Sequence, residues 1–234
     1  MTDGLIPFAL EVEDPAALRA QEQAYRGLAD AVRALVDATV RTSVPNEQAD
    51  DVAARVRALT ATLLADAQDG PLGLQVCSDG RLRDHGNPAV GMRNAIAPPL
   101  RIERGADGRS ATTRFELGAP YEGPPGHVHG GWVAVVLDQV LGTIAALGGR
   151  PGLTAYLNLT YVRPTPLGPL SCEGWVVEAT ERKTLVRGRI LDEAGATTAE
   201  AEGLFVIPAW ALDALAIPQS DAGDFPAPAG VGEG

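Results

Sequence analysis

Residues 126–131 read Gly-His-Val-His-Gly-Gly and run directly into an apolar segment over residues 132–147, in which Asp138 is the only charged side chain. A helix that begins at such a glycine pair presents free backbone N–H groups at the positive end of its macrodipole. Asp138 lies nine residues after His129 among Val, Leu, Ile and Ala, where an unpartnered buried carboxylate costs on the order of several kcal/mol. The segment therefore combines a candidate oxyanion donor with a candidate base or nucleophile, which is typical of an enzyme.

The sequence on either side of this helix predicts a curved antiparallel sheet. Two runs ahead of it, residues 100–103 and 110–117, are joined by Gly-Ala-Asp-Gly and indicate a hairpin. In the first run after it, alternation places Leu157 and Leu159 on one face and Thr154 on the other. Four β-like runs in all follow the helix, over residues 153–162, 170–179, 184–192 and 197–207. A helix that is apolar nearly all round fits the inside of such a sheet, which predicts an α+β fold with an edge strand that a second copy often covers.

Two amphipathic helices are predicted ahead of this region. Asp14 and Pro15 fit the N-cap and first position of a helix whose apolar stripe continues to Val40. Residues 43–46 break the pattern, and a second stripe covers about residues 47–67. We expect a helical extension, an irregular connector, a main domain and a disordered tail, over residues 1–70, 71–93, 94–217 and 218–234.

The composition of the 234-residue chain limits its class. Apolar residues form 45% of the chain, which is enough for a sizeable core. The formal net charge of −11 argues against a nucleic-acid partner and against an anionic membrane surface. The N-terminus lacks the pattern of a signal peptide, and residues 132–147 fall short of the roughly 20 residues that span a bilayer. We therefore expect a soluble cytoplasmic protein without membrane insertion.

Residues 121–131, Tyr-Glu-Gly-Pro-Pro-Gly-His-Val-His-Gly-Gly, followed by Asp138, resemble the signature of the hotdog-fold acyl-CoA thioesterases. The similarity is to the phenylacetate-type and thioesterase superfamily member branch, and it covers about residues 94–208. Further matches are Asn-Leu-Thr-Tyr at residues 158–161, Pro164, Gly168, Asp192, Gly195, Ala199, Ala201, Gly203 and Phe205. The resemblance implies a hotdog fold, hydrolysis of an acyl-CoA to a carboxylic acid and CoA, no metal or redox cofactor, and a homodimer or homotetramer.

The resemblance also assigns roles to individual residues. Asp138 corresponds to the catalytic carboxylate, as general base or nucleophile. The backbone N–H of Gly130, with that of Gly131, corresponds to the donor that holds the thioester carbonyl oxygen. His129 belongs to the same motif and orients that end of the site, and Thr154 stands where these enzymes place a hydroxyl that positions the water, often across the subunit interface.

The phosphates of coenzyme A require local cations on an acidic protein. Arg182 and Lys183, in a predicted turn between two strands, are the first candidates for these contacts, and Arg163 is the next.

One position departs from the resemblance and leaves alternatives open. Gly123 stands where many bacterial relatives have Asn, six residues before His129. A non-catalytic acyl-CoA-binding hotdog protein, or a hotdog hydratase or dehydratase, is therefore an alternative, although such hydratases usually carry a His near an acid on the central helix. A metal site built from His127, His129 and Asp138 or His85 is disfavoured, because no histidine lies four residues from another ligand on a helix.

Overall fold

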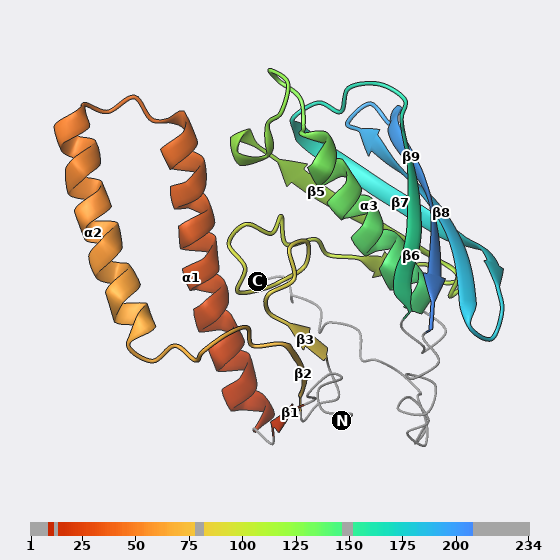
Figure 1. The fold of residues 1–234 in the computed structure, drawn as a ribbon, viewed down its shortest axis with the longest axis horizontal. Coiled ribbons are helices and arrows are strands. Elements are labelled where there is room, and N and C mark those ends of the chain that lie inside the picture. Colours follow the sequence, from red (N-terminus) through yellow and green to blue (C-terminus); the bar gives the residue numbers. More distant parts are fainter. Residues whose placement is uncertain (1–8, 12–13, 78–81, 147–151, 208–234) are drawn as a thin grey trace, which may run out of the picture.

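The structure is a computed structural model that describes residues 9–11, 14–77, 82–146 and 152–207. In the described part of the chain, a six-stranded sheet with one helix is joined to two N-terminal helices and a small three-stranded sheet (Figure 1). The elements in chain order are β1 (Ala9–Glu11), α1 (Pro15–Arg41), α2 (Asn46–Leu64), β2 (Leu74–Cys77), β3 (Leu82–Asp84), β4 (Glu103–Arg104), β5 (Ser110–Leu117), the 3-10 helix η1 (Ala119–Tyr121), α3 (Gly130–Ala145), β6 (Leu153–Tyr161), β7 (Gly168–Ala179), β8 (Lys183–Asp192) and β9 (Thr197–Val206).

The six-stranded sheet wraps around α3 and confirms the predicted α+β architecture. Its strand order is β4-β5-β7-β8-β9-β6, and every pair of neighbours is antiparallel. Figure 1 shows α3 lying along one face of this sheet. Fully or almost fully buried side chains of α3 form the centre of the core, namely Val133, Val136, Leu137, Val140, Leu141 and Ile144. The four strands after α3 begin and end within about two residues of their predicted limits.

Two paired glycines allow α3 to pack closely on the middle of the sheet. Gly174 of β7 is the register partner of Gly188 of β8. A Cβ atom on Gly174 would lie 2.9 Å from Cδ2 of Leu141, and one on Gly188 would lie 2.8 Å from the same atom. Leu141 therefore packs directly on the sheet backbone, and this contact fixes the position of the helix that carries the candidate site.

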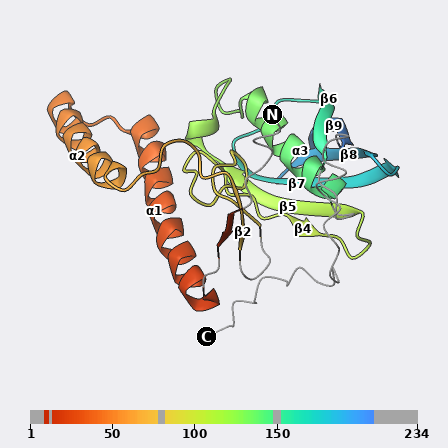
Figure 2. The ribbon, with the colours of Figure 1, turned by 60° about the horizontal axis from the view of Figure 1, so that its bottom comes forward.

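The two N-terminal helices form a layer of their own beside the sheet (Figure 2). As predicted, Asp14 caps α1, and its carboxylate accepts hydrogen bonds from the backbone N–H groups of Ala16 and Ala17 at 3.0 Å. α2 begins one residue before its predicted start and ends at Leu64 rather than Ala67. None of the residues of α2 is buried, so its apolar stripe contacts no core in the described chain.

The connector is less irregular than expected. β1, β2 and β3 form a small sheet in which Ala9 is the register partner of Gln75, so residues from the start of the chain pair with the connector. Strands of three or four residues are too short to produce a clear alternating pattern. The predicted hairpin is present, but its first strand is only β4, because the Leu100 N–H donates to the carbonyl of Ala89 instead of to a strand.

Two further predictions concern the domain boundaries with the C-terminal tail, and membrane insertion. The predicted tail, residues 218–234, lies outside the described residues, and the predicted domain limits stay predictions. In the part of the chain that the structure describes, no helix is long and apolar enough to cross a membrane.

Candidate functional site

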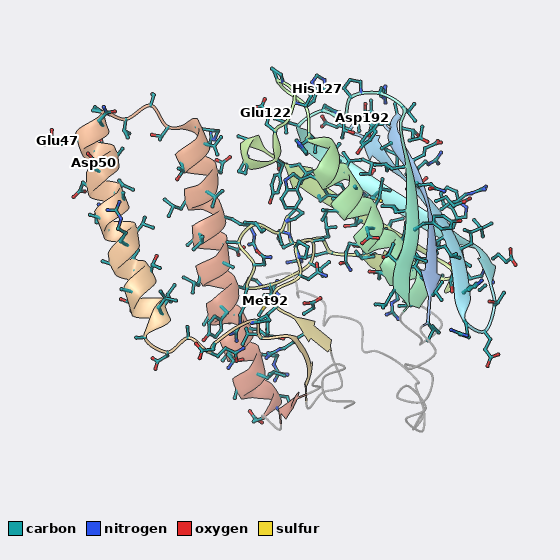
Figure 3. All side chains as sticks on the ribbon, viewed as in Figure 1. Glu47, Asp50, Met92, Glu122, His127 and Asp192 are labelled. Atoms are coloured by element: carbon teal, nitrogen blue, oxygen red, sulfur yellow. The ribbon has the colours of Figure 1, made fainter. Side chains whose placement is uncertain are left out.

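The loop ahead of α3 is held by its own main chain. The Gly123 N–H donates to the His127 carbonyl, and the His129 N–H donates to the Tyr121 carbonyl, both at 2.9 Å. Figure 3 shows Glu122 and His127 at this end of α3. The loop therefore fixes where the helix begins.

Gly123 occupies a position with no room for a side chain. A Cβ atom there would lie 2.7 Å from Cα and 3.2 Å from the backbone N of His129. Because these are backbone atoms, an Asn at position 123 would force the loop apart. Gly123, the position that departs from the resemblance, therefore lies in a loop that packs tightly against the backbone of His129.

The two glycine N–H groups at the start of α3 differ in their partners. His129 is the N-cap, and its Nδ1 accepts a hydrogen bond from the Gly131 N–H at 3.0 Å. The Gly130 N–H has no hydrogen-bond acceptor among the described residues. It also lies in the first turn, where the macrodipole favours negative charge. Of the two predicted donors, only Gly130 is thus available to a ligand, and His129 orders the turn that presents it.

Tyr161 was not among the predicted site residues, yet it contacts Gly130. Its hydroxyl group donates a hydrogen bond to the Gly130 carbonyl at 2.9 Å. A Cβ atom on Gly130 would lie 2.9 Å from the same hydroxyl oxygen. The alternation that groups Tyr161 with Leu157 and Leu159 on one strand face is the sequence signal that points to this contact.

Asp138 and Thr154 form a second polar group, further along α3. The Thr154 hydroxyl donates a hydrogen bond to Oδ1 of Asp138 at 3.0 Å. Thr154 is exposed and Asp138 is half-buried, so the expectation of a buried Asp138 is wrong in the single chain. The reason is that Asp138 faces β6, which is an edge strand of the sheet. The carboxylate is therefore accessible to water and to a ligand.

A β-bulge in β6 turns Thr154 toward α3. Thr154 is the register partner of Phe205 and Leu157 is the partner of Gly203, with a register shift between Thr154 and Tyr156. Phe205 and Leu157 both pack in the core around α3. Strict alternation predicts Thr154 on the face opposite Leu157, and this prediction is wrong because the bulge adds one residue to the strand.

Comparisons with known proteins identify the family of the chain. The family model for the thioesterase superfamily matches residues 125–199, which contain Gly130, Asp138 and Thr154. A crystal structure of a thioesterase superfamily protein is 34% identical, with a TM-score of 0.70, and the match covers 88% of this chain and 98% of that one. The chain belongs to the thioesterase superfamily.

Curated members of the superfamily match shorter parts of the chain. Acyl-coenzyme A thioesterase THEM4 of Mus musculus is 45% identical over 53 residues, which is 23% of each protein. Acyl-coenzyme A thioesterase THEM5 of Mus musculus is 31% identical over 94 residues, which is 39% of this chain and 38% of the relative. The chain thus spans about a quarter to two fifths of the length of these relatives.

The predicted phosphate-binding cations of this thioesterase superfamily chain are not brought together. Arg163 forms an ion pair with Asp192 at 3.0 Å, and Arg182 donates to the Ile207 carbonyl at 3.3 Å. Lys183 begins β8 and Asp192 ends it, so they lie roughly 30 Å apart along the strand. Arg163 thus lies at the opposite end of the sheet from Arg182 and Lys183.

No group of three His, Cys, Asp or Glu side chains in the described chain is arranged to hold a metal ion. The Nδ1 atom of His127 lies 2.9 Å from the Pro125 carbonyl oxygen. Burial raises the pKa of the Cys172 thiol well above its usual range, since this side chain lies in the core.

Proposed function

We propose that this protein hydrolyses an acyl-CoA thioester to a carboxylic acid and free CoA. The observation that carries the proposal is that α3 bears both an N–H without an acceptor, at Gly130, and the hydrogen-bonded pair of Asp138 and Thr154. Membership of the thioesterase superfamily and the similarity to proteins named acyl-coenzyme A thioesterase support the substrate class.

The proposed reaction uses each of these groups once. Thr154 donates to one carboxylate oxygen of Asp138, and the other oxygen accepts a proton from the attacking water. The water oxygen bonds to the thioester carbon, and the Gly130 N–H stabilises the negative charge that develops on the carbonyl oxygen. The C–S bond then breaks, and the proton held by Asp138 passes to the CoA thiolate. If Asp138 instead attacks as a nucleophile, its carboxylate bonds to the acyl carbon, CoA thiolate leaves and a mixed anhydride forms. Water that attacks the aspartyl carbonyl of this anhydride then leaves oxygen-18 in Asp138 when the water is labelled.

The distance between the two halves of the site indicates that two copies of the chain share it. Gly130 and Asp138 are eight residues apart on α3, or about 12 Å along the helix axis. A base and an oxyanion donor must both lie within about 3 Å of the groups on which they act. Among the strands that the structure describes, β6 has a neighbour on one side only, so it can pair with a second copy. We therefore propose that each active site is formed by Gly130 of one subunit together with Asp138 and Thr154 of its partner.

The first experiment measures free thiol released from a panel of acyl-CoAs by the native protein and by Asp138→Asn. We expect kcat to fall about 10²–10⁴-fold, because a positioned general base contributes an acceleration of this size. Asp51→Asn, an exposed carboxylate on α2, is the matched control and retains full turnover. Turnover that survives Asp138→Asn would refute the assignment. Acyl-CoA binding by a native protein that releases no thiol would favour a non-catalytic role. This alternative follows from Gly123, which stands where many bacterial relatives have Asn.

A second experiment isolates the Gly130 N–H. Gly130 is the first helical residue, where proline fits, and the extended backbone of His129 suits a residue ahead of proline. Gly130→Pro removes the N–H, whereas Gly130→Ala retains it and brings a similar contact with Tyr161. We expect the proline variant to be about 10²–10³-fold slower than the alanine variant. Equal rates in the two variants would contradict the oxyanion role.

Mixed oligomers test the shared site. Random assembly of inactive Gly130→Pro and inactive Asp138→Asn chains makes half of the dimers mixed, and each mixed dimer carries one intact site of two. We therefore expect coexpression to restore about one quarter of native activity. No recovery, with mixed dimers shown by mass spectrometry, would place both groups of each site on one chain.

A further inference from the structure

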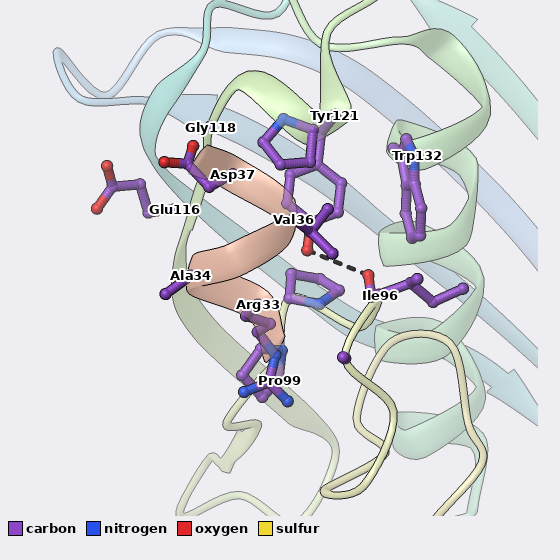
Figure 4. A pocket seen from close by; sticks show the side chains of 13 residues that line it. Arg33, Ala34, Val36, Asp37, Ile96, Pro99, Glu116, Gly118, Tyr121 and Trp132 are labelled. Atoms are coloured by element: carbon purple, nitrogen blue, oxygen red, sulfur yellow. Dashed lines mark hydrogen bonds between the residues drawn. The ribbon is translucent and has the colours of Figure 1, made fainter. Parts of the chain in front are cut away.

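A cavity of about 490 Å³ lies between α1 and the start of α3 (Figure 4). Sites for small molecules commonly have volumes of about 300–1,000 Å³ and mostly apolar walls. The side chains that give this cavity its apolar character are those of Val36, Ile96, Pro98, Pro120, Tyr121 and Trp132. They come from α1, from residues 94–100, which follow the connector, and from the two ends of the loop that leads into α3.

One wall of the cavity is built onto the candidate site. Trp132 stands in the first turn of α3, two residues after Gly130. Its ring packs edge-to-face on Tyr121, with centroids 4.9 Å apart and an interplanar angle of 89°. The Tyr121 hydroxyl donates to the Ile96 carbonyl at 3.1 Å and so holds the segment of residues 94–100 against this wall. The Ile96 side chain is 54% exposed, so an apolar ligand has surface to cover here.

The opposite wall is α1, and its charged groups are already paired. Arg33 donates to the Ala97 carbonyl at 2.9 Å and also pairs with Asp30. Asp37 accepts a hydrogen bond from Nε of Arg41 at 2.8 Å. The remaining charged residue of the lining is Glu116 of β5, a carboxylate that repels an anion. Because the α1 charges have partners, the cavity favours an uncharged ligand over an anionic one.

We infer that this cavity receives the acyl group of the substrate, and that the acyl group is uncharged and apolar. The inference rests on the proposed function and deepens it. The carbonyl carbon of a thioester bound at the Gly130 N–H carries two groups, the acyl chain and the CoA moiety. Only the acyl chain can leave water without losing polar contacts. Trp132, which lines the cavity, stands in the same turn of α3 as Gly130. α1 and residues 94–100, which lie outside the family-model match over residues 125–199, then determine which acyl groups fit.

The proposal predicts a defined dependence on chain length. Each methylene group that enters the cavity is expected to raise kcat/KM about fourfold, until the cavity is full. A carboxylate at the far end of the acyl group, as in succinyl-CoA, is expected to abolish this gain.

The experiment compares Val36→Trp, which fills the cavity from α1, with Val40→Trp. Val40 lies one turn further along α1, is 55% exposed and is not part of the cavity, so its variant is the matched control. With saturated acyl-CoAs from acetyl to palmitoyl, we expect Val36→Trp to lower the ratio of kcat/KM for the longest preferred chain to that for acetyl at least tenfold. Val40→Trp keeps the native profile. Identical profiles for Val36→Trp and the native protein would overturn the inference, and Ile96→Trp repeats the test from the segment of residues 94–100 if Val36→Trp does not fold.

Calorimetric binding of non-hydrolysable thioether analogues of acyl-CoA separates this inference from the proposed function. Affinity that rises with chain length in the native protein but not in Val36→Trp supports the cavity even if no thioester is hydrolysed. Turnover through Asp138 with binding that is independent of chain length supports the proposed function and overturns the inference.

Discussion

α3 and α2 have similar lengths but opposite relations to the rest of the molecule. Seven of the sixteen residues of α3 are buried, whereas none of the nineteen residues of α2 is buried. A side chain, that of His129, caps α3, while Pro45 ahead of α2 makes no side-chain capping bond. Packing on the sheet thus sets the position of α3, on which the proposed site depends. The existence of α2 follows from local helix-forming residues, and nothing in the described chain sets its position to the same degree.

α1 is intermediate between α2 and α3 in how it is attached to the rest of the molecule, because polar contacts supply much of that attachment. Its only buried residues are Leu18 and Ala29. Arg83 of β3 donates to Glu22 at 2.9 Å and to the Leu18 carbonyl at 3.2 Å, with its own side chain 5% exposed. Since a buried charge without its partner is costly, these contacts form or break together. The position of α1 therefore depends on one ion pair and on side-chain hydrogen bonds to backbone carbonyls more than on apolar packing.

The largest predicted effect on stability comes from a substitution in α3. Leu141→Ala is expected to lower the free energy of unfolding by about 2–5 kcal/mol, because Gly174 and Gly188 offer no side chains to fill the space. Urea denaturation followed by circular dichroism measures the change. A loss below about 1 kcal/mol would mean that α3 is not fixed by this contact.

The next largest predicted effect on stability concerns the polar residues between α1 and the connector, namely Glu22, Arg83, His85 and Arg93. Burial, and after it the nearby Arg93 and Arg83, lower the pKa of His85 from 6.5 to about 4, against the opposing effect of Glu22 and Asp84. Between these two pKa values the unfolded chain binds more protons than the folded one, so stability is complete above pH 6.5 and is lost as the pH falls toward 4. We expect this group to account for a loss of about 1–3 kcal/mol.

Denaturation at a series of pH values checks this prediction. In His85→Gln the part of the pH dependence between 6.5 and 4 should shrink, because no proton is taken up at that position. An unchanged pH dependence in the variant would assign the acid sensitivity to other groups and would remove the contrast between the polar α1 layer and the apolar α3 core.

The sequence predicts the α3 layer far better than the N-terminal layer, and the reason is physical. A helix that is apolar nearly all round and strands with a period of two are local patterns, which single stretches of sequence contain. The pairing of Ala9 with Gln75 joins short strands more than sixty residues apart, and no local pattern encodes it. The amphipathic stripe of α2 predicts a helix but not what, if anything, the stripe packs against.

The candidate site shows the same limit at the scale of single residues. Asp138 and Gly130 are predictable from the motif, because their spacing on one helix is fixed. The direction of Thr154 depends on a bulge between strands and runs against simple alternation. The hydrogen bond that occupies the Gly131 N–H depends on the rotamer of His129, which the sequence does not specify.

A smaller effect tests the contact between α3 and its edge strand. Thr154→Val removes the hydroxyl that donates to Asp138 while keeping the shape of the side chain. We expect kcat to fall about tenfold, which corresponds to ~1.4 kcal/mol, with KM little changed. Thr154→Ser retains the hydroxyl and should restore most of the rate in the same thiol-release assay. If serine and valine behave alike, the hydroxyl has no part in catalysis, and the bulge only shapes the strand.

The smallest predicted effect is the counterpart of Leu141→Ala on α2. Leu63 is 53% exposed, so Leu63→Ala is expected to change the free energy of unfolding by no more than about 0.5 kcal/mol. The measurement is repeated over a range of protein concentrations, because a contact with a second copy makes the loss depend on concentration. A loss above about 1 kcal/mol that grows at high concentration would show that assembly covers the stripe of α2. In that case α2 and α3 would differ only in whether the surface that buries them belongs to the same chain.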